Sequence, residues 1–80
     1  MNTLTDYIYK ISSRAIDDSL KEPLFLIRRR DKGYNIFGGR SGRLHGLLFF
    51  DKDEDEYLFY NIEGLFQKSL SLKGLGKYML

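Results

Sequence analysis

The chain has 80 residues, of which 42% are hydrophobic, 30% charged and 15% aromatic, and its formal net charge is +2. So short a chain is expected to form one small domain over residues 1–80 around a single core. Cysteine is absent, which excludes a disulfide framework and a cysteine-based zinc site. The longest apolar run has four residues, at 47–50, whereas a membrane-spanning helix needs about 20. With no signal-peptide pattern either, we expect a cytoplasmic protein without membrane contact or cofactor.

Residues 3–20 are predicted to form an amphipathic helix. Its apolar positions recur at steps of four, three and four residues and would share one face: Leu4, Ile8, Ile11 and Ala15. Thr3 and Asp6 approximate a capping box at the start. The residue before Pro23 avoids helical backbone angles, so the helix should end there. The alternative is a strand over residues 7–11, but the persistence of the helical spacing favours the helix.

Four apolar segments after Pro23 are predicted as strands in two antiparallel hairpins: residues 24–30, 34–37, 44–50 and 57–62. Gly33 supplies the first turn, because glycine adopts positive φ angles. The charged run at 51–56 forms the turn of the second hairpin. The glycine-rich segment 38–43 is expected to be a flexible connection. The predicted fold class is therefore α+β, with the N-terminal helix packed on an antiparallel sheet of about four strands.

The C-terminal segment, residues 64–80, has two interpretations. Residues 65–73 have the spacing of a short helix, which we favour, while residues 69–73 alternate as a fifth strand would. Gly74 and Gly76 argue against a helix beyond residue 73. The last three residues, 78–80, are apolar, so we expect them to dock against another part of the protein.

Opposite charges are concentrated in two segments of the chain. Residues 28–43 carry six basic side chains against one acidic, a balance of +5. Residues 51–63 carry six acidic side chains against one basic, a balance of −5. The basic side chains are Arg28, Arg29, Arg30, Lys32, Arg40 and Arg43. The predicted acidic patch is Asp51, Asp53, Glu54, Asp55 and Glu56.

The basic side chains are candidates for contact with an anion or a nucleic acid. Arginine presents a planar fork that suits phosphate, and Tyr34 and Phe37 could stack on bases. However, three consecutive arginines on a strand point to alternating faces, so they cannot form one clamp. The alternative is a solvated hairpin end whose arginines pair with the acidic turn. The backbone amides of residues 38–43 could also form an anion-binding nest.

The acidic turn does not match a calcium-binding loop. The EF-hand pattern needs a central glycine and a closing glutamate, but the corresponding positions counted from Asp51 hold Glu56 and Ile62. The acidic patch could instead mimic a phosphate backbone and enter a basic cleft of a partner. The simplest interpretation is a charged turn that keeps an aromatic hairpin soluble. No metal site is predicted.

No catalytic pattern is present in the sequence. His45 is the only histidine, and a single histidine in a strand pattern is typical of a packed or edge residue. A nucleophile would have to be serine or threonine, but the nucleophile-elbow pattern is missing. Acids in one exposed turn do not acquire the shifted pKa values that acid–base catalysis needs. We therefore predict that the protein is not an enzyme.

Apolar side chains occupy both faces of the strand at 57–62, and one helix can cover only one face of a sheet. Apolar area should therefore remain exposed in a monomer. Because tyrosine and arginine are enriched at interface hot spots, we predict a surface that contacts another protein. Its predicted residues are Tyr57, Phe59, Tyr60, Phe50 and Tyr34.

The predicted function is a small non-enzymatic protein-binding module, an inhibitor or accessory factor that acts by surface contact. The partner would be a second copy of the chain or a different protein, for example in a nucleic-acid-processing complex. Phage-encoded antagonists of host nucleases, of the anti-CRISPR or anti-restriction type, have this size, although no motif identifies that group. The alternative is a small nucleic-acid-binding protein that uses residues 28–43.

Overall fold

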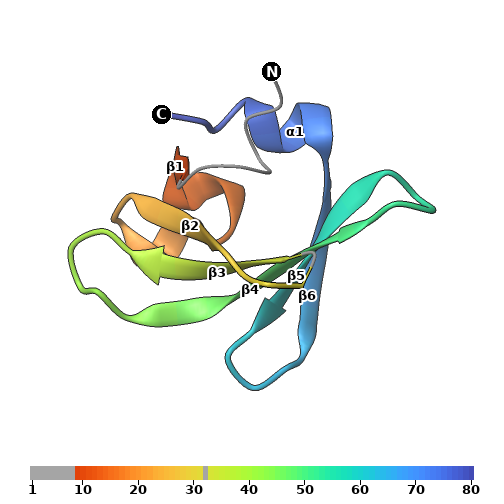
Figure 1. The fold of residues 1–80 in the computed structure, drawn as a ribbon. Coiled ribbons are helices and arrows are strands. Elements are labelled where there is room, and N and C mark those ends of the chain that lie inside the picture. Colours follow the sequence, from red (N-terminus) through yellow and green to blue (C-terminus); the bar gives the residue numbers. More distant parts are fainter. Residues whose placement is uncertain (1–8, 32) are drawn as a thin grey trace.

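The structure, a computed structural model, describes residues 9–31 and 33–80. Six strands each pair antiparallel with their neighbour in sequence, so they form a meander (Figure 1). The strands are β1 (Tyr9–Ile11), β2 (Leu24–Arg28), β3 (Gly33–Gly38), β4 (Leu44–Asp51), β5 (Glu56–Asn61) and β6 (Phe66–Ser71). Two 3₁₀ turns, η1 (Ser13–Ala15) and η2 (Asp18–Leu20), connect β1 to β2, and the short helix α1 (Leu72–Gly76) follows β6.

The predicted helix over residues 3–20 is wrong in its described part, which forms β1 and the two 3₁₀ turns. The remainder, including Leu4 and Ile8, lies outside the described residues. The Ser12 hydroxyl accepts a hydrogen bond from the Arg14 amide at 3.2 Å, and the Asp17 carboxylate accepts one from the Ser19 amide at 3.0 Å. Side-chain acceptors of this kind compete with the helical hydrogen bonds of the backbone, which explains why single turns form here.

The fold class changes with this correction, because the protein is mostly one antiparallel sheet and not a helix on about four strands. The four predicted strands are present with similar limits as β2 to β5. The favoured C-terminal helix is also wrong, since residues 66–71 form β6. α1 begins only at Leu72 and includes both Gly74 and Gly76. The Ser71 hydroxyl caps it by accepting a hydrogen bond from the Gly74 amide at 2.8 Å.

The predicted docking of the C-terminal residues is confirmed, and their partner is β1. Met79 forms a β-bridge with Ile11. The Ser12 amide donates to the Tyr78 carbonyl at 2.8 Å, and the Leu80 amide donates to the Lys10 carbonyl at 2.9 Å. The end of the chain therefore lies beside β1 (Figure 1). There it covers the edge of β1 that faces away from β2, which is an edge of the sheet.

The two faces of the sheet carry similar apolar side chains but differ in the elements that pack against them. We call the face that packs against Leu75 of α1 and Ala15 of η1 the inner face. Its buried side chains are Leu24, Leu26, Tyr34, Ile36, Leu48, Tyr57 and Phe59. Their strand neighbours point the other way, because side chains alternate along a strand. This second surface, the outer face, carries half-buried side chains: Phe25, Ile27, Phe37, Leu47, Phe49, Leu58 and Tyr60.

Candidate functional site: an apolar outer face

The strand register places side chains of the outer face in one row, which is apolar except for Asn35 in β3. Ile27 pairs with Asn35, Asn35 with Leu47, Leu47 with Tyr60, and Tyr60 with Phe66. The Tyr60 and Phe66 rings lie 5.7 Å apart between centroids, with the edge of one toward the face of the other. Opposite residues in neighbouring strands are within contact distance. The outer face is therefore a mostly apolar surface that crosses the sheet from β2 to β6.

The turn between β5 and β6 extends this surface into solvent. We call Ile62, Leu65 and Phe66 the apolar tip; their exposed fractions are 64%, 58% and 53%. Figure 1 shows this turn protruding from the body of the sheet, away from α1. Large apolar side chains exposed together on a small protein commonly mark an interaction site. The apolar tip is therefore the feature of the outer face that most needs explanation.

The turn that carries the apolar tip is held by Asn61. Its side-chain oxygen accepts hydrogen bonds from the Glu63 amide at 2.9 Å and the Leu65 amide at 3.0 Å. Its backbone amide donates to the Leu65 carbonyl at 3.0 Å, and its carbonyl accepts from the Gly64 amide at 2.9 Å. Gly64 adopts a φ of +81°, which glycine tolerates without strain. Four hydrogen bonds thus fix the turn before any partner arrives, which lowers the entropy lost on binding.

The sequence placed the apolar surface on partly different residues. Tyr34, Tyr57 and Phe59 are at most 6% exposed and belong to the core, and burial raises the pKa of the Tyr57 phenol. Phe50 is half-buried and packs against that core, with its ring 5.1 Å from the ring of Tyr57. Tyr60 lies on the outer face. Of the predicted partner-binding set, Tyr60 is the member whose side chain lies on the outer face, opposite Leu47.

The exposed members of the surface were missed because the sequence predicted a strand that ends at Ile62 and favoured a helix from Leu65, so no apolar hairpin turn was expected there. Ile62 and Leu65 flank Glu63 and Gly64, so the turn residues themselves gave no hydrophobic periodicity. The available signal was the composition of that turn. Two large aliphatic side chains beside a glycine, directly after an asparagine that can organise the backbone, are unusual in a solvated connection.

The structure divides the predicted basic residues between the two ends of β3. Arg28 is the last residue of β2 and is followed by Arg29 and Arg30 in the β2–β3 connection, whereas Arg40 and Arg43 lie in the β3–β4 connection at the opposite end. Lys32 lies outside the described residues. The Arg29 guanidinium pairs with Asp31 at 3.1 Å and lies 5.5 Å from the centroid of the Phe49 ring, which is a cation–π contact. We call residues 28–31 the basic tip.

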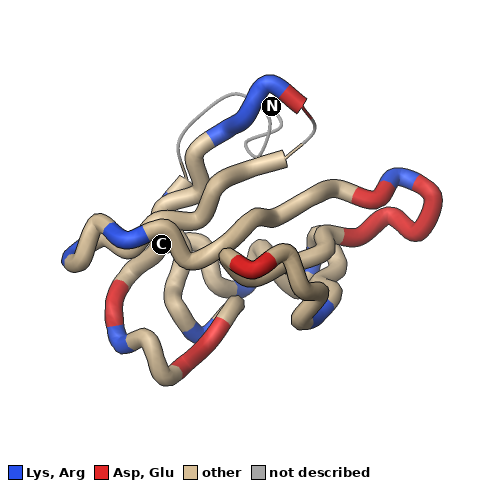
Figure 2. Tube along the Cα trace, turned by 90° about the horizontal axis from the view of Figure 1, so that it is seen from below, with Lys and Arg blue, Asp and Glu red and all other residues tan. Residues whose placement is uncertain are grey.

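The predicted acidic patch forms the tip of the β4–β5 hairpin, which we call the acidic tip (residues 51–56). The Asp53 amide donates to the Asp51 carboxylate at 3.1 Å, and Asp55 has a φ of +55°. Because Gly33 pairs with Phe49, the basic tip and the acidic tip lie at the same end of the sheet. Figure 2 shows them on two separate arms. Among residues 9–31 and 33–80, no three acidic or histidine side chains are arranged to share a metal ion.

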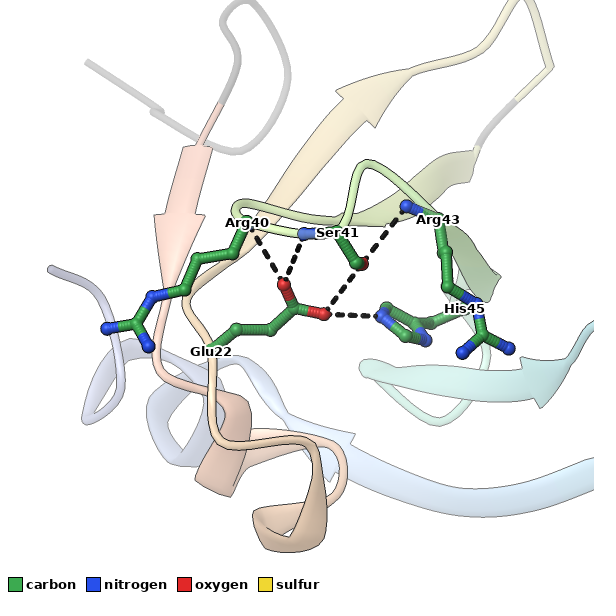
Figure 3. Close-up of polar contacts among 5 residues, drawn as sticks. All are labelled: Glu22, Arg40, Ser41, Arg43 and His45. Carbon is green, nitrogen blue, oxygen red and sulfur yellow. Dashed lines mark hydrogen bonds and ion pairs between the residues drawn. The ribbon is translucent and has the colours of Figure 1, made fainter.

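A second polar cluster joins the glycine-rich connection to the residue before Pro23 (Figure 3). One oxygen of the Glu22 carboxylate accepts hydrogen bonds from the Arg40 and Ser41 amides, both at 2.9 Å. The other accepts from the Ser41 hydroxyl at 2.9 Å and contacts His45 Nε2 at 3.0 Å. The Arg43 amide donates to the Ser41 hydroxyl at 3.1 Å. Residues 38–43, predicted to be flexible, are therefore tied to the sheet.

The backbone amides of the glycine-rich connection do form an anion nest, and the anion is the protein's own carboxylate. These donors, with His45, lower the pKa of Glu22 from 4.5 to about 2, because hydrogen bonds to the charged form stabilise it. The site is enclosed, with side-chain exposures of 8% for Glu22 and 12% for His45. A Cβ at Gly38 would overlap the Glu22 carboxylate and the Ser41 hydroxyl. Glycine at position 38 is thus required for the cluster to close.

The cluster holds a serine, a histidine and a carboxylate, but not in the order that activates a nucleophile. In a catalytic triad the imidazole lies between the hydroxyl and the acid, where it can remove the hydroxyl proton. Here the Glu22 carboxylate lies between Ser41 and His45. The hydroxyl proton is directed to the carboxylate, which holds its own proton weakly and is a poor base. The arrangement fastens the connection to Glu22, and the Arg40 side chain points away from it (Figure 3).

Comparison of the chain with protein-family models, with curated proteins and with solved structures finds no match. Within residues 9–31 and 33–80, no helix has the length and apolar character that crossing a bilayer requires.

Proposed function

We propose that this protein is a non-enzymatic protein-binding module, an inhibitor or accessory factor that works by surface contact through the outer face. The single observation that carries the proposal is the apolar tip, whose three large side chains are each more than half exposed. Full burial of such a side chain contributes about 1.5–3 kcal/mol. A partner that covers the tip therefore gains a driving force that the isolated chain leaves unused.

The surroundings of the apolar tip also suit a protein partner. Interface hot spots combine aromatic and arginine side chains in the centre of a contact surface, and the outer face joins Tyr60 and Phe49 to the guanidinium of Arg29. The two charged tips lie at the far end of the same sheet, where they can orient an encounter without being desolvated. The non-enzymatic part of the proposal is supported by the order of the groups around Glu22.

The nucleic-acid alternative has less support from the geometry. Its arginines lie at opposite ends of β3, and the acidic tip lies at the same end as the first group. A phosphate backbone following β3 would approach this concentration of carboxylates. Titration with labelled single-stranded DNA at two salt concentrations tests the alternative, which requires binding near about 50 mM salt that weakens steeply as salt rises.

The proposed function is tested with paired substitutions in the apolar tip. Proteins captured from a cell extract by the wild-type chain should be lost with Ile62→Ser combined with Leu65→Ser. The matched control is Leu80→Ser, because Leu80 is also an exposed apolar side chain, at 69%, but lies beside β1. The proposal fails if the tip variant retains the same captured proteins as the wild type, or if the control loses them equally.

A further inference from the structure

We infer that the partner which the outer face fits is a second copy of this chain, packed face to face about a twofold axis parallel to the strands. The inference rests on the proposed function, because it names the occupant of the same surface. It depends on the arrangement of the two charged tips relative to the middle of the sheet. A twofold axis requires that the same surface be complementary to itself.

The charged tips meet this requirement. The described residues of the basic tip comprise three arginines against one aspartate, and the acidic tip comprises five acids against one lysine. Both tips lie at the same end of the sheet, one continuing β3 and the other β4, which are neighbouring strands. Let the twofold axis run midway between the two stacked sheets, over the boundary between β3 and β4 and parallel to both strands. Rotation about it places β3 of one copy over β4 of the other. The basic tip of each copy then lies over the acidic tip of the other, and the attraction occurs twice.

The same rotation brings complementary apolar parts together. It places β5 of one copy over β2 of the other, so the protruding apolar tip meets the rings of Phe25 and Phe37. These two rings pair across β2 and β3 and are half-buried, which leaves part of each for contact. Two twisted sheets packed in this way lie about 10 Å apart, with interdigitated side chains between them. The apolar tip of each copy is thus received by the half-buried rings of Phe25 and Phe37 on its partner.

The size of the molecule allows such an interface. A standard interface removes about 800 Å² from each partner, and the chain has an accessible surface of 5304 Å², so roughly one-seventh would be covered. The outer face extends over five strands, β2 to β6, and includes the apolar tip. Because each copy uses its outer face once, the contact closes on itself and yields a dimer. An open filament would need two different surfaces.

The experiment is a charge-exchange test followed by sedimentation velocity over a range of protein concentrations. Arg29→Glu with Arg30→Glu changes the formal charge of the basic tip from +2 to −2, so both charged contacts of the dimer become negative. Asp53→Lys, Glu54→Lys and Glu56→Lys together change the formal charge of the acidic tip from −4 to +2, so both contacts become positive. Each of these two variants alone should have a dimer dissociation constant raised at least about tenfold, by repulsion in both contacts. An equimolar mixture of the two variants restores opposite charges in both contacts and should sediment as a dimer with nearly wild-type affinity.

Two outcomes overturn the inference. One is a wild-type chain that remains monomeric at every concentration, and the other is a mixture that associates no better than either variant alone. The proposed function fails separately, since it requires only that the apolar tip contact some protein. A monomeric wild type that loses a captured protein on Ile62→Ser with Leu65→Ser would sink the dimer and leave the proposed function standing. Dimerisation that is insensitive to both the tip substitutions and the charge reversals would contradict a dimer through the outer face, whereas the proposed function would fail only if the tip variant also retained the captured proteins.

Discussion

The inner and outer faces of the sheet are built by the same strands from the same kinds of residue, yet among residues 9–31 and 33–80 other elements cover only the inner face. In β5 the rings of Tyr57 and Phe59 are buried under the 3₁₀ turns and α1, while Tyr60, one position on, points outward. The difference between the faces therefore comes from parity along the strand and from the position of the covering elements, and not from composition. An apolar face without a cover is the physical reason to expect a partner.

The largest expected effect comes from comparing neighbours in β4. Leu48 lies on the inner face with no exposed surface, and Leu48→Ala should lower the free energy of unfolding by about 2–5 kcal/mol, because it leaves a cavity. Leu47 lies on the outer face, and Leu47→Ala should cost about 1 kcal/mol or less in dilute solution. Chemical denaturation of both variants measures the difference. Equal losses would mean that the outer face is packed as tightly as the core.

A smaller effect is expected where the glycine-rich connection closes on Glu22. Gly38→Ala places a methyl group against the Glu22 carboxylate and the Ser41 hydroxyl, and overpacking of this kind typically costs about 1–3 kcal/mol. Gly76→Ala is the matched control, since nothing lies near its added Cβ and alanine favours a helix by up to about 1 kcal/mol. Thermal unfolding should show opposite shifts for the two variants; a neutral Gly38→Ala would contradict the close packing around Glu22.

The same cluster predicts a dependence of stability on acid. The pKa of Glu22 is about 2 in the folded chain and 4.5 ordinarily, so the unfolded chain takes up the proton first as the pH falls. The stabilisation is complete above about pH 4.5 and is lost as the pH falls toward 2. Thermal unfolding should therefore show a shallower loss of stability over this window in Glu22→Gln than in the wild type. Glu63→Gln, which removes an exposed carboxylate, should retain the wild-type slope, and identical slopes for all three proteins would refute the assignment.

The smallest effect on folding is expected at the apolar tip. Ile62→Ser with Leu65→Ser should change the free energy of unfolding by about 0.5 kcal/mol or less, because exposed side chains contribute little to the folded chain. The same pair should abolish association. Denaturation measured well below the dimer dissociation constant isolates the folding term. A loss of several kcal/mol there would show that the tip serves the fold and not a partner.

The sequence predicted the middle of this fold well and its ends poorly. Residues 24–62 contain apolar or aromatic segments of strand length separated by clear turn residues, so four strands could be placed. Residues 9–20 failed because Ile11 and Ala15 satisfy a helical spacing and are buried for a different reason, one in a strand and one in a 3₁₀ turn. Local hydrogen bonds that the Ser12 and Asp17 side chains accept from backbone amides favour the 3₁₀ turns, and they are not visible in a hydrophobic pattern.

The candidate site was predicted in kind but not in its residues. The excess of apolar surface could be predicted from the composition. That Tyr60 lies on the face opposite to Tyr57 and Phe59 could be predicted from the alternation of side chains along a strand. The burial of Tyr34, Tyr57 and Phe59 depends on where α1 and the 3₁₀ turns pack, which is tertiary information. The Glu22 cluster could not be found from spacing, because Ser41 and His45 reach Glu22 only after β3 and β4 have paired.

Hydroxyl-radical footprinting of the protein at low and high concentration tests most directly whether a second copy covers the outer face. Ile62, Leu65 and Phe66 should react less in the concentrated sample, while the exposed side chains of Leu72 and Leu80, which lie away from the outer face, should react equally in both. Equal reactivity of the apolar tip at the two concentrations, or protection at Leu72 and Leu80 instead, would contradict the assignment of the outer face as the surface that a second copy covers.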